Sequence, residues 1–548
     1  MSPEPSVPTD PVDTPPVDST RTRDLRTWDD DWAGLRVVVA GIGTAGFAAA
    51  DTLIELGAAV VVVDAGDSDA ARQAADTLRI VGARDVLLGP DTAGTLPVID
   101  DAAPELVVVS PGWRPSAPLL RAAAAAGVPV WGDTELAWRL TERAGRTTPA
   151  WLAITGTNGK TTTVGMTEAI LQAGGLKAIA VGNVGTPILD ALRDPVEYDV
   201  LAVELSSFQL HYSHSLSPLA SVCLNIAEDH VDWHGSYEAY RDAKAKVYER
   251  TRVACVYNAE QIETERMVED ADVVEGARAV GFTTGAPGLS MVGIVEGLLV
   301  DRAFIAERRT SAAELGHVSD IGELVPRHQV ANALAAAALC RAAGVEPVAV
   351  RDGLRAYQPG AHRIQPVATR DGVLWVNDSK ATNPHAADAS LAAFRPVVWI
   401  AGGLSKGVAY DELVTRHRDR LRAVVLIGAD SADLRAALGR HAPDVPVIER
   451  AAGETGSGQS DDVGKRSVDE HGPGSDVMAW AVSAAVATAT DGDTVLMAPA
   501  AASMDQFVSY AERGDAFIRA VQHLVTDART ADTGPTGQAS SGGGADAG

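Results

Sequence analysis

The chain has 548 residues, of which 46% are hydrophobic and 22% are charged, a composition typical of globular proteins. This length predicts about three domains. The formal net charge of −27 argues against nucleic acid or an anionic membrane as the main partner. Residues 1–31 lack the apolar core of a signal peptide, and no apolar run approaches the ~20 residues that span a bilayer. We therefore expect a cytoplasmic protein without membrane insertion.

Composition and hydrophobic pattern divide the chain into segments. Residues 1–33 are rich in Pro, Asp and Thr and are predicted to be a disordered extension. Three α/β domains are expected to follow, at residues 34–148, 149–355 and 356–526. Within the third, residues 452–475 are rich in Gly, Ser and Asp and are interpreted as a disordered insertion, and residues 527–548 as a disordered tail. The three cysteines, Cys223, Cys255 and Cys340, lie in apolar stretches and are expected to be reduced core residues.

Apolar runs predict the strands of each domain. In the first domain they lie at residues 37–40, 60–64, 106–110 and 128–131. In the second they lie at residues 151–155, 178–181, 199–205, 220–226 and 253–257, followed by short strands and turns over 278–324 and a helix from 328 to 341. The third has candidate strands at residues 374–377, 397–401, 423–427 and 494–497.

The first strand runs directly into residues 41–46, which read G-I-G-T-A-G. A helical stretch and a second strand ending in Asp64 follow, which is the Rossmann-like pattern of dinucleotide and nucleotide-sugar binding. The glycines would admit a pyrophosphate, and Asp64 would accept hydrogen bonds from a ribose or base. A βαβ unit without a ligand remains the alternative for this motif taken alone. The third strand ends at Ser110, at the sheet edge where ligands of such folds bind.

Residues 156–163, after the strand at 151–155, read G-T-N-G-K-T-T-T. A strand, a glycine loop, a lysine and hydroxyl residues that open a helix form a cradle for nucleotide phosphates. The glycines let backbone N–H groups approach phosphate oxygens, Lys160 supplies charge to the β- and γ-phosphates, and the Thr161 hydroxyl can hold Mg²⁺. The motif predicts a P-loop ATPase-like central domain.

Acidic and histidine residues follow the next two strands. Glu204 ends one of them and is expected to reach a Mg²⁺ held by Thr161. His230 and His234 are four residues apart, a spacing that also occurs at zinc sites. We favour one histidine as a ligand to a second Mg²⁺ or a contact to the γ-phosphate, because residues 233–236 read as a turn rather than a helix. A structural histidine is the remaining alternative.

Ser236 is a predicted helix N-cap, and the helix after it places Tyr237, Tyr240, Lys244 and Val247 on one stripe. An unpaired ammonium on an apolar face is costly, so Lys244 should have a partner or a modification. The alternative, slightly favoured by the residues alone, is that the side chain extends to solvent.

Eight segments occur in a fixed order: GTNGKTTT, ELSSFQL, NIAEDHVDWHGSYEAYRDAK, HQVANALAA, GAHR, NDSKATN, GGLSKG and PAAASMDQF. Over about residues 35–524 the chain thereby resembles the Mur ligase family. The segments from 156 to 244 also fit the related folylpolyglutamate synthetases. The glycine motif at 41–46 indicates a muramate-binding member, and NDSKATN with MDQF indicates the member that adds D-glutamate.

The resemblance implies an α/β protein of three domains: an N-terminal Rossmann-like domain, a central P-loop ATPase-like mixed sheet and a C-terminal Rossmann-like domain. It implies an ATP-dependent acid–D-amino-acid ligase of peptidoglycan precursor synthesis. ATP would phosphorylate the carboxylate of UDP-N-acetylmuramoyl-L-alanine, and the D-glutamate amine would attack the acyl phosphate, releasing phosphate beside ADP. We expect two Mg²⁺ sites and a monomer.

The resemblance also implies roles for individual residues. The catalytic set would be Lys160, Glu204, His230 and Lys244, and the metal ligands Thr161, Glu204, His230 and a carbamylated Lys244. ATP would contact Gly156, Thr157, Asn158, Gly159, Lys160, Thr161, Thr162, Asn332, Arg363 and Asp378. The UDP-linked substrate would contact Gly43, Thr44, Ala45, Gly46, Asp64, Ser110 and Asn183. D-Glutamate would contact Lys380, Thr382, Lys406, Ser503 and Tyr510.

The sequence departs from the family pattern in two places. The usual S-P-A-C-A-S is A-P-A-A-A-S at residues 498–503, so Ala498 receives no role, and the usual phenylalanine is Tyr510. Three other readings remain to be separated. They are another amino-acid-adding ligase, a nicotinamide-dependent oxidoreductase built on the first domain, and a non-catalytic nucleotide-sugar sensor. The oxidoreductase leaves residues 156–163 unexplained, and the intact set of Lys160, Thr161, Glu204 and His230 argues against the sensor.

Overall fold

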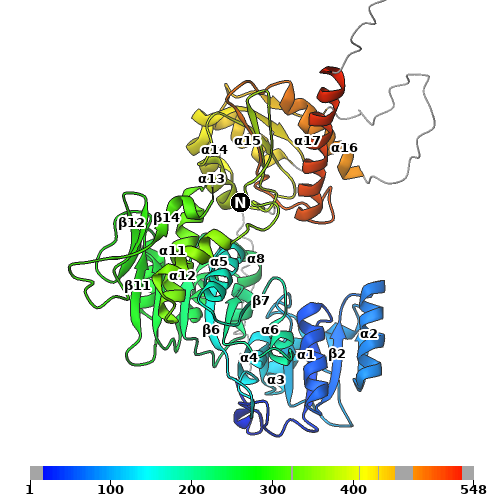
Figure 1. Ribbon diagram of the computed structural model, residues 1–548. Helices are drawn as coiled ribbons and strands as arrows, with labels where there is room; N and C mark the ends of the chain where they lie inside the picture. The colour runs from blue at the N-terminus through cyan, green and yellow to red at the C-terminus, as the bar shows by residue number, and fades with distance from the viewer. Residues whose placement is uncertain (1–16, 323–324, 406–407, 430, 451–472, 533–548) are drawn as a thin grey trace, which may run out of the picture. The chain divides into compact units, whose positions relative to one another are not determined.

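The computed structural model describes residues 17–322, 325–405, 408–429, 431–450 and 473–532. The chain forms two compact units, Met1–Tyr357 and Gln358–Gly548 (Figure 1). The first unit holds a five-stranded and a nine-stranded sheet, and the second holds a six-stranded sheet. Along most of the chain, strands alternate with helices, as predicted for an α/β protein.

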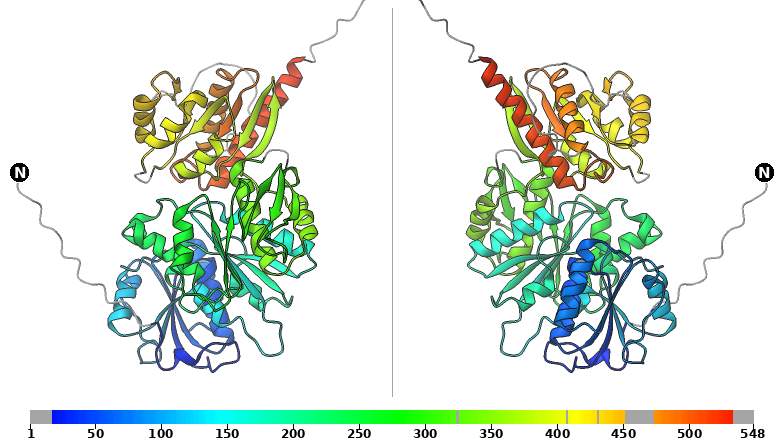
Figure 2. Two further views of the ribbon diagram at one scale, coloured as in Figure 1. Left: turned by 90° about the vertical axis from the view of Figure 1, so that its left-hand side faces the viewer. Right: turned by 90° about the vertical axis from the view of Figure 1, so that its right-hand side faces the viewer.

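The first sheet is parallel, with strand order β3-β2-β1-β4-β5. Its strands are β1 Arg36–Ala40, β2 Ala59–Asp64, β3 Asp85–Leu88, β4 Leu106–Val109 and β5 Val130–Gly132. Its helices are α1 Thr44–Glu55, α2 Asp69–Val81, α3 Pro118–Ala125 and α4 Asp133–Arg139. Figure 2 shows α1, in blue, along one face of this sheet. This strand order confirms the Rossmann-like prediction. β3 was not predicted, because its apolar run is only three residues long, from Val86 to Leu88.

The prediction that residues 1–33 are disordered is wrong for residues 17–33. This segment contains a 3-10 helix, Thr22–Asp24. Three side chains that follow this helix lie in the core: Leu25, Trp28 and Trp32. The rings of Trp32 and Trp131 meet edge to face with centroids 6.5 Å apart. The composition of the segment does not reveal this packing. Two large aromatic side chains bury much apolar surface, yet they barely change the average hydropathy of a polar segment. Residues 1–16 lie outside the described residues.

The second sheet has the order β14-β13-β12-β11-β10-β9-β6-β8-β7. It is parallel from β7 to β12 and antiparallel from β12 to β14, so it is mixed, as predicted. Its strands are β6 Ala150–Thr155, β7 Ala178–Gly182, β8 Val200–Glu204, β9 Ala220–Cys223, β10 Ala254–Asn258, β11 Arg278–Phe282, β12 Met291–Val295, β13 Leu298–Asp301 and β14 Ala313–His317. Its helices are α5 Lys160–Ala173, α6 Ile188–Arg193, α7 Ser207–His211, α8 Val231–His234, α9 Tyr237–Ala245, α10 Ile262–Glu269, α11 Arg327–Ala342 and α12 Pro347–Ala356.

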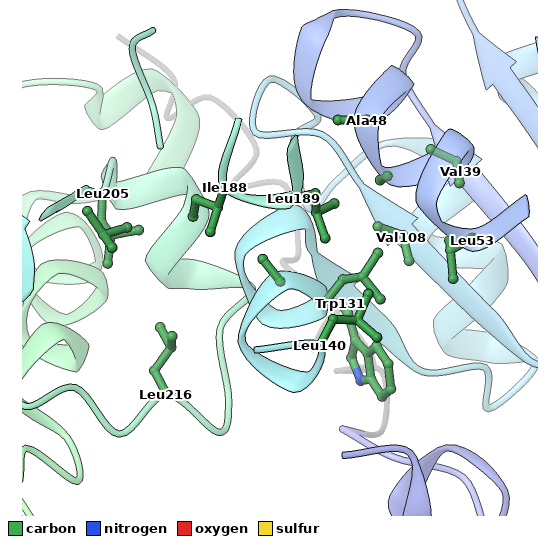
Figure 3. Close-up of a cluster of buried hydrophobic side chains, with 14 of the residues drawn as sticks. Val39, Ala48, Leu53, Val108, Trp131, Leu140, Ile188, Leu189, Leu205 and Leu216 are labelled. Atoms are coloured by element: carbon green, nitrogen blue, oxygen red, sulfur yellow. The ribbon is translucent and has the colours of Figure 1, made fainter. Parts of the chain in front are cut away.

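One continuous apolar core joins the first and second sheets. Figure 3 shows Val39 and Trp131 of the first sheet in the same cluster as Ile188, Leu189 and Leu205 of the second. A separate core lies between the second sheet and the alanine-rich α11. The three cysteines are buried and reduced, as predicted.

The second unit contains a sheet of order β15-β16-β20-β17-β18-β19. Its strands are β15 Gln365–Arg370, β16 Val373–Asn377, β17 Val397–Ala401, β18 Leu421–Leu426, β19 Val447–Ile448 and β20 Thr494–Met497. Its helices are α13 Pro384–Leu391, α14 Asp411–His417, α15 Ala432–His441, α16 Pro473–Val486 and α17 Tyr510–Asp532. Figure 2 shows α17, in red, beside the antiparallel pair β15–β16.

Parts of two segments of the second unit that were predicted to be disordered are helical. Helix α16 begins at Pro473, so residues 473–475 are helical, and α17 continues to Asp532, past the expected start of the tail at 527. Residues 452–472 and 533–548 lie outside the described part of the chain. Within that part, no helix is long and apolar enough to cross a membrane.

Candidate active site

The predicted phosphate loop follows β6, an inner strand of the second sheet that pairs with β8 and β9. The loop turns at Gly156, with φ of 148°, and at Gly159, with φ of 86°, conformations that favour glycine. Helix α5 begins at Lys160, so its N-terminal N–H groups open at the loop. Thr161 and Thr162 form its first turn. The local structure is therefore the strand, loop and helix that the motif predicts.

Asn225, which follows β9, holds the loop from the neighbouring strand. Its side-chain Oδ1 accepts a hydrogen bond from the Asn158 N–H at 2.9 Å, and its Nδ2 donates to the Asn158 carbonyl at 3.0 Å. Its own carbonyl accepts from the Thr157 N–H. The Lys160 Nζ donates to the carbonyl oxygens of Gly156, at 2.8 Å, and Thr157, at 2.9 Å. Asn225 received no role from the sequence, yet its three hydrogen bonds fix the shape of the loop.

Asn332, which the resemblance assigned to ATP, lies on α11 against the phosphate loop. A Cβ atom at Gly159 would lie 2.4 Å from the Asn332 Oδ1, so glycine is required there for space as well as for its backbone angle. Asn332 itself is buried. This contact places a polar amide at the helix face that borders the loop.

Glu204 and Asn183, predicted separately as a metal ligand and a substrate contact, lie side by side. Glu204 ends β8 and is buried. Its Oε1 accepts a hydrogen bond from the Asn183 Nδ2 at 3.1 Å, and its carbonyl accepts from the Asn183 N–H at 3.0 Å. In the sheet, Glu204 is the register partner of Ile154, which lies just before the phosphate loop. The carboxylate therefore stands at the sheet edge that carries the loop.

His230 occupies a left-handed backbone conformation, with φ of 52°, which residues other than glycine rarely adopt. It caps α8, so the interpretation of Trp233 and His234 as part of a turn is wrong: they end a one-turn helix. The His230 ring packs edge to face on Phe208, with centroids 4.8 Å apart, and its side chain is 42% exposed. The backbone thus fixes an accessible imidazole on the rim of the site. The His234 Nε2 instead lies 3.0 Å from the Ser207 hydroxyl.

Lys244 is buried rather than extended to solvent, so the alternative of a solvent-directed side chain is wrong. Its Nζ donates to the Gly156 carbonyl at 2.9 Å and lies 3.4 Å from the Thr155 Oγ1. The Tyr240 ring centroid is 5.0 Å away, and the Tyr240 hydroxyl is 2.9 Å from the Thr157 Oγ1. Burial, and then the nearby ammonium of Lys160, lower the pKa of Lys244 to about 7.

The glycine motif of the first sheet forms a tight turn at the carboxyl end of β1. Gly43 caps α1, and Thr44, Ala45 and Gly46 form its first turn. A Cβ atom at Gly46 would lie 2.0 Å from the Gly41 carbonyl and 2.6 Å from the Ser110 Oγ. The helix can approach β1 this closely only with glycine at that position. The Ser110 Oγ is buried and has no hydrogen-bond partner among the described residues, which fits a polar ligand at this edge.

Asp64, at the end of β2, is hydrogen-bonded to the same turn. Its Oδ2 accepts from the Ile42 N–H and its Oδ1 from the Gly66 N–H, both at 2.7 Å. The carboxylate therefore orients the glycine loop from the neighbouring strand. The structure brings the motif, Asp64 and Ser110 to one sheet edge, as predicted from parallel strands.

In the second unit, Asp378 and Arg363 lie close together. Asp378 follows β16 and is buried, with its Oδ1 accepting from the Ile364 N–H at 3.3 Å and its Oδ2 from the Ser390 hydroxyl. Burial raises the pKa of Asp378 to about 6, although the charge of Arg363 acts in the opposite direction.

Loops after β16 and β20 bring together most of the residues predicted for D-glutamate. The Lys380 Nζ lies 4.0 Å from the Tyr510 ring centroid, and Thr382 is two residues further along the same loop. The loop that carries the buried Ser503 is tied to it, because the Ala500 N–H donates to the Ala381 carbonyl at 2.9 Å. Lys406 lies outside the described residues.

Arg513, on α17, joins these two loops and was missed from the sequence. It is 1% exposed. Its Nε donates to the Ser379 Oγ at 3.0 Å, its Nη2 to the Ser379 carbonyl at 2.9 Å, and its Nη1 to the Ala501 carbonyl at 3.2 Å. An available signal was its position one helical turn after Tyr510, on a helix whose first residue was already assigned to the site.

The residues present fit ATP and Mg²⁺. A glycine loop, a helix N-terminus and a lysine suit phosphate groups, and the Thr161 hydroxyl with the Glu204 carboxylate supplies the oxygen ligands that Mg²⁺ prefers. The His230 ring centroid lies 6.4 Å from that of Tyr240, whose hydroxyl contacts Thr157 of the same loop.

Two domain families match the chain. The Mur ligase middle domain matches residues 154–340, which contain the phosphate loop, and the Mur ligase glutamate ligase domain matches residues 362–501. Together they cover the second sheet and most of the second unit. The chain belongs to the Mur ligase family.

Relatives of high similarity carry a more specific name. Proteins from Leifsonia xyli subsp. xyli and Streptomyces avermitilis, each named UDP-N-acetylmuramoylalanine–D-glutamate ligase, are 52% and 54% identical to this chain over 513 and 494 residues. The first alignment covers 91% of this chain and 95% of that protein, and the second 90% and 99%.

Solved structures share the fold at low sequence identity. A pseudomurein peptide ligase type C from Methanothermus fervidus aligns with a TM-score of 0.51 at 16% identity, covering 90% of this chain and 100% of that one. MurF ligase from Thermotoga maritima, solved in complex with ADP, aligns with a TM-score of 0.50 at 16% identity, covering 85% and 96%.

Proposed function

We propose that this protein joins D-glutamate to UDP-N-acetylmuramoyl-L-alanine with hydrolysis of ATP, a step of peptidoglycan precursor synthesis. The observation that supports this most directly is the phosphate loop with Lys160, Glu204 and Lys244 around it. The chain is also 52% and 54% identical, over about nine-tenths of its length, to two ligases named for this reaction. The substrate carboxylate attacks the γ-phosphorus of ATP and ADP leaves. The D-glutamate amine then attacks the acyl phosphate, and phosphate leaves as the amide forms.

The phosphate loop binds and neutralises the triphosphate. Its N–H groups, the helix terminus and Lys160 face the phosphate oxygens, where negative charge shifts during transfer. Lys160 gives up its present hydrogen bonds to Gly156 and Thr157 when a phosphate oxygen becomes available. The protein thus acts by positioning and charge stabilisation, without a covalent intermediate on its own side chains.

One Mg²⁺ would be held by Thr161 and Glu204, and it would screen the charges of the two approaching anions. A second position would use His230 with a carbamylated Lys244. Two facts favour carbamylation: Lys244 is buried beside the loop, and its pKa of about 7 leaves a large neutral amine fraction near neutral pH. The neutral amine is the form that reacts with CO₂.

Substrates are assigned to three places. The turn at Gly43–Gly46, with Asp64 and Ser110, would bind the UDP group, and Asn183 would contact the muramoyl group beside Glu204. Asn332, Arg363 and Asp378 would bind the adenine, phosphate and ribose of ATP. Lys380, Thr382, Lys406, Ser503 and Tyr510 would bind D-glutamate, with lysines opposite its carboxylates.

Phosphate release from ATP tests this function. The purified protein is incubated with UDP-N-acetylmuramoyl-L-alanine and, in separate reactions, with D-glutamate, L-alanine or meso-diaminopimelate. We expect release with D-glutamate alone. Release with another amino acid would assign a different ligase of the family. A change in nicotinamide absorbance at 340 nm with candidate substrates, without phosphate release, would favour an oxidoreductase.

A further inference from the structure

Glu135, on α4 at the end of the first sheet, is a fully buried carboxylate that the proposed ligand sites do not use. Three of its hydrogen bonds come from the chain between α7 and β9 of the second sheet. It accepts from the N–H of His214 at 2.7 Å, the N–H of Ser215 at 2.9 Å and the hydroxyl of Ser215 at 2.6 Å. Glu135 therefore ties the first sheet's last helix to the second sheet.

Arg139, one turn later on α4, extends this link to the N-terminal segment, defined here as residues 17–33. Its Nε donates to Glu135 at 2.8 Å, and its Nη1 donates to the carbonyls of Thr22 and Leu25 at 3.1 and 3.2 Å. Its Nη2 lies 3.1 Å from a carboxylate oxygen of Asp18. Arg139 is 5% exposed, so this is a buried junction of the N-terminal segment, α4 and the second sheet.

A second link from α4 ends next to the candidate metal site. The buried Asp133 accepts a hydrogen bond from the Gln209 Nε2 at 3.1 Å. The Oε1 of Gln209 in turn accepts from the N–H of Ser206, which caps α7 two residues after Glu204. Helix α4 thus contacts two points, Gln209 and His214–Ser215, of the segment that follows the proposed metal ligand.

Burial would raise the pKa of Glu135, but Arg139 and the donors from Ser215 and His214 outweigh that effect, and the net pKa is lowered. The Glu135 carboxylate is therefore ionised at neutral pH. A buried ion pair of this kind contributes little net stability compared with an apolar pair, but it specifies one geometry, because each partner must meet its donors or acceptors.

We propose that Glu135 and Arg139 are positioning residues that hold the nucleotide-sugar site of the first sheet at a fixed distance from the phosphate loop of the second, with the N-terminal segment as the third member of the junction. The proposal rests on the proposed function. The UDP group of the substrate binds at the carboxyl edge of β1 and β2. The alanine carboxylate of the same substrate must reach the γ-phosphate of ATP at the phosphate loop, which follows β6. Their separation is set by the junction of the two sheets, and a misplacement of about 1 Å can cost roughly a hundredfold in rate.

Arg139→Met is the main variant, because Glu135 keeps its three other donors and the methionine can occupy the face of Trp131, now 4.0 Å from the guanidinium. Arg139→Lys keeps the charge but not the forked hydrogen bonding and should be intermediate. Arg121→Met, at an exposed arginine on α3, is the matched control. Should Arg139→Met fail to fold, Ser215→Ala removes a single hydrogen bond of the junction and is measured in its place.

The distance between the sheets is measured directly in the full chain with nitroxide labels on Ile80→Cys and Leu289→Cys. Ile80 is 85% exposed and lies in the part of the first unit that holds the first sheet. Leu289 is 54% exposed and lies in the part that holds the second sheet. The three native cysteines are buried and stay unlabelled. Pulsed electron resonance should give a narrow distance distribution for the parent and for Arg121→Met, and a broadened or shifted one for Arg139→Met. An unchanged distribution in Arg139→Met overturns the proposal.

Kinetics provide the second measurement. For Arg139→Met we expect kcat to fall roughly tenfold or more, while the Kd values for ADP and for UDP-N-acetylmuramoyl-L-alanine stay within about twofold and one ADP binds per chain. A loss of kcat matched by a loss of ADP-binding chains would mean a merely structural role and would overturn the proposal. If the parent protein releases no phosphate with D-glutamate, the proposed function fails, and the distance measurement still decides whether the junction holds the two sheets.

Discussion

The Lys244 ammonium lies 2.9 Å from the carbonyl oxygen of Gly156, so helix α9 is hydrogen-bonded to the first residue of the phosphate loop. The same carbonyl accepts from Lys160. Two ammonium groups therefore share one acceptor at the point where a triphosphate is proposed to bind. Conversion of one of them to a carbamate would replace this repulsion with attraction and supply an anionic ligand for a cation.

Lys244→Ala should be nearly inactive, because it removes the proposed carbamate. A short carboxylic acid such as acetate or formate should partly restore turnover by occupying the vacated position. Lys244→Arg should stay inactive, since it keeps a positive charge. Phosphate release is the measurement, and Arg241→Ala, on the exposed side of the same helix, is the control that should behave as the parent. An active Lys244→Arg protein would contradict the carbamate proposal.

Lys244→Met should stabilise the fold in CO₂-free buffer, and more so at low pH. The folded pKa of about 7 lies below the unfolded value of 10.5, so the unfolded state binds more protons between these values. The penalty for the buried ammonium is thus complete below pH 7, on the order of 5 kcal/mol, and disappears above pH 10.5. Denaturant unfolding of both proteins at pH 6 and pH 10 should show the larger difference at pH 6. An equal difference at the two pH values would mean that Lys244 is not a buried free amine.

Lys160→Ala should lower ATP turnover by roughly a hundredfold or more while leaving the melting temperature within a few degrees. The reason is that Lys160 lies over the loop rather than in the core, so the change removes charge stabilisation and little packing. Lys177→Ala, at an exposed lysine before β7, is the control. Near-normal turnover in folded Lys160→Ala protein would contradict the assignment of the phosphate loop.

Ser503→Ala and Lys380→Met should raise the KM for D-glutamate about tenfold or more and leave the KM for ATP nearly unchanged. Both residues lie on the tied loops after β16 and β20, and they are proposed to contact the incoming amino acid alone. Initial-rate measurements with each substrate varied in turn provide the test. Similar increases in the KM for D-glutamate and the KM for ATP would contradict the proposal that these residues contact D-glutamate alone.

Asp133→Asn should remove a pH-dependent loss of stability. Burial raises the pKa of Asp133 from 3.8 to about 6, so the folded protein keeps a proton that the unfolded chain releases between these values. The contribution of Asp133 to stability therefore falls by about 3 kcal/mol as the pH rises through this window. Asparagine does not ionise, so the stability of the variant relative to the parent should increase from pH 4 to pH 7. If the unfolding free energies of variant and parent differ by the same amount across that range, the pKa of Asp133 is not raised in the folded protein.

The sequence by itself determined the α/β class, nearly all inner strands and the residues at the strand ends. These are local properties: β-branched runs specify strands, and glycines with positive φ at Gly41 and Gly156 mark the turns that follow them. Because parallel strands end at a common edge, the sequence also placed Glu204 beside the phosphate loop and Ser110 beside the glycine turn.

The tertiary structure decided what depends on contacts between distant segments. Residues 17–33 have a polar composition, yet Trp28 and Trp32 reach a core formed by strands far along the chain. Lys244 could extend to solvent or turn inward, and the Gly156 carbonyl, 88 residues earlier, selects the inward position. The roles of Asn225, Glu135 and Arg513 were equally hidden, because a polar side chain shows in the sequence only its chemistry. Its function in the fold is set by which donors and acceptors the packed chain brings within about 3 Å.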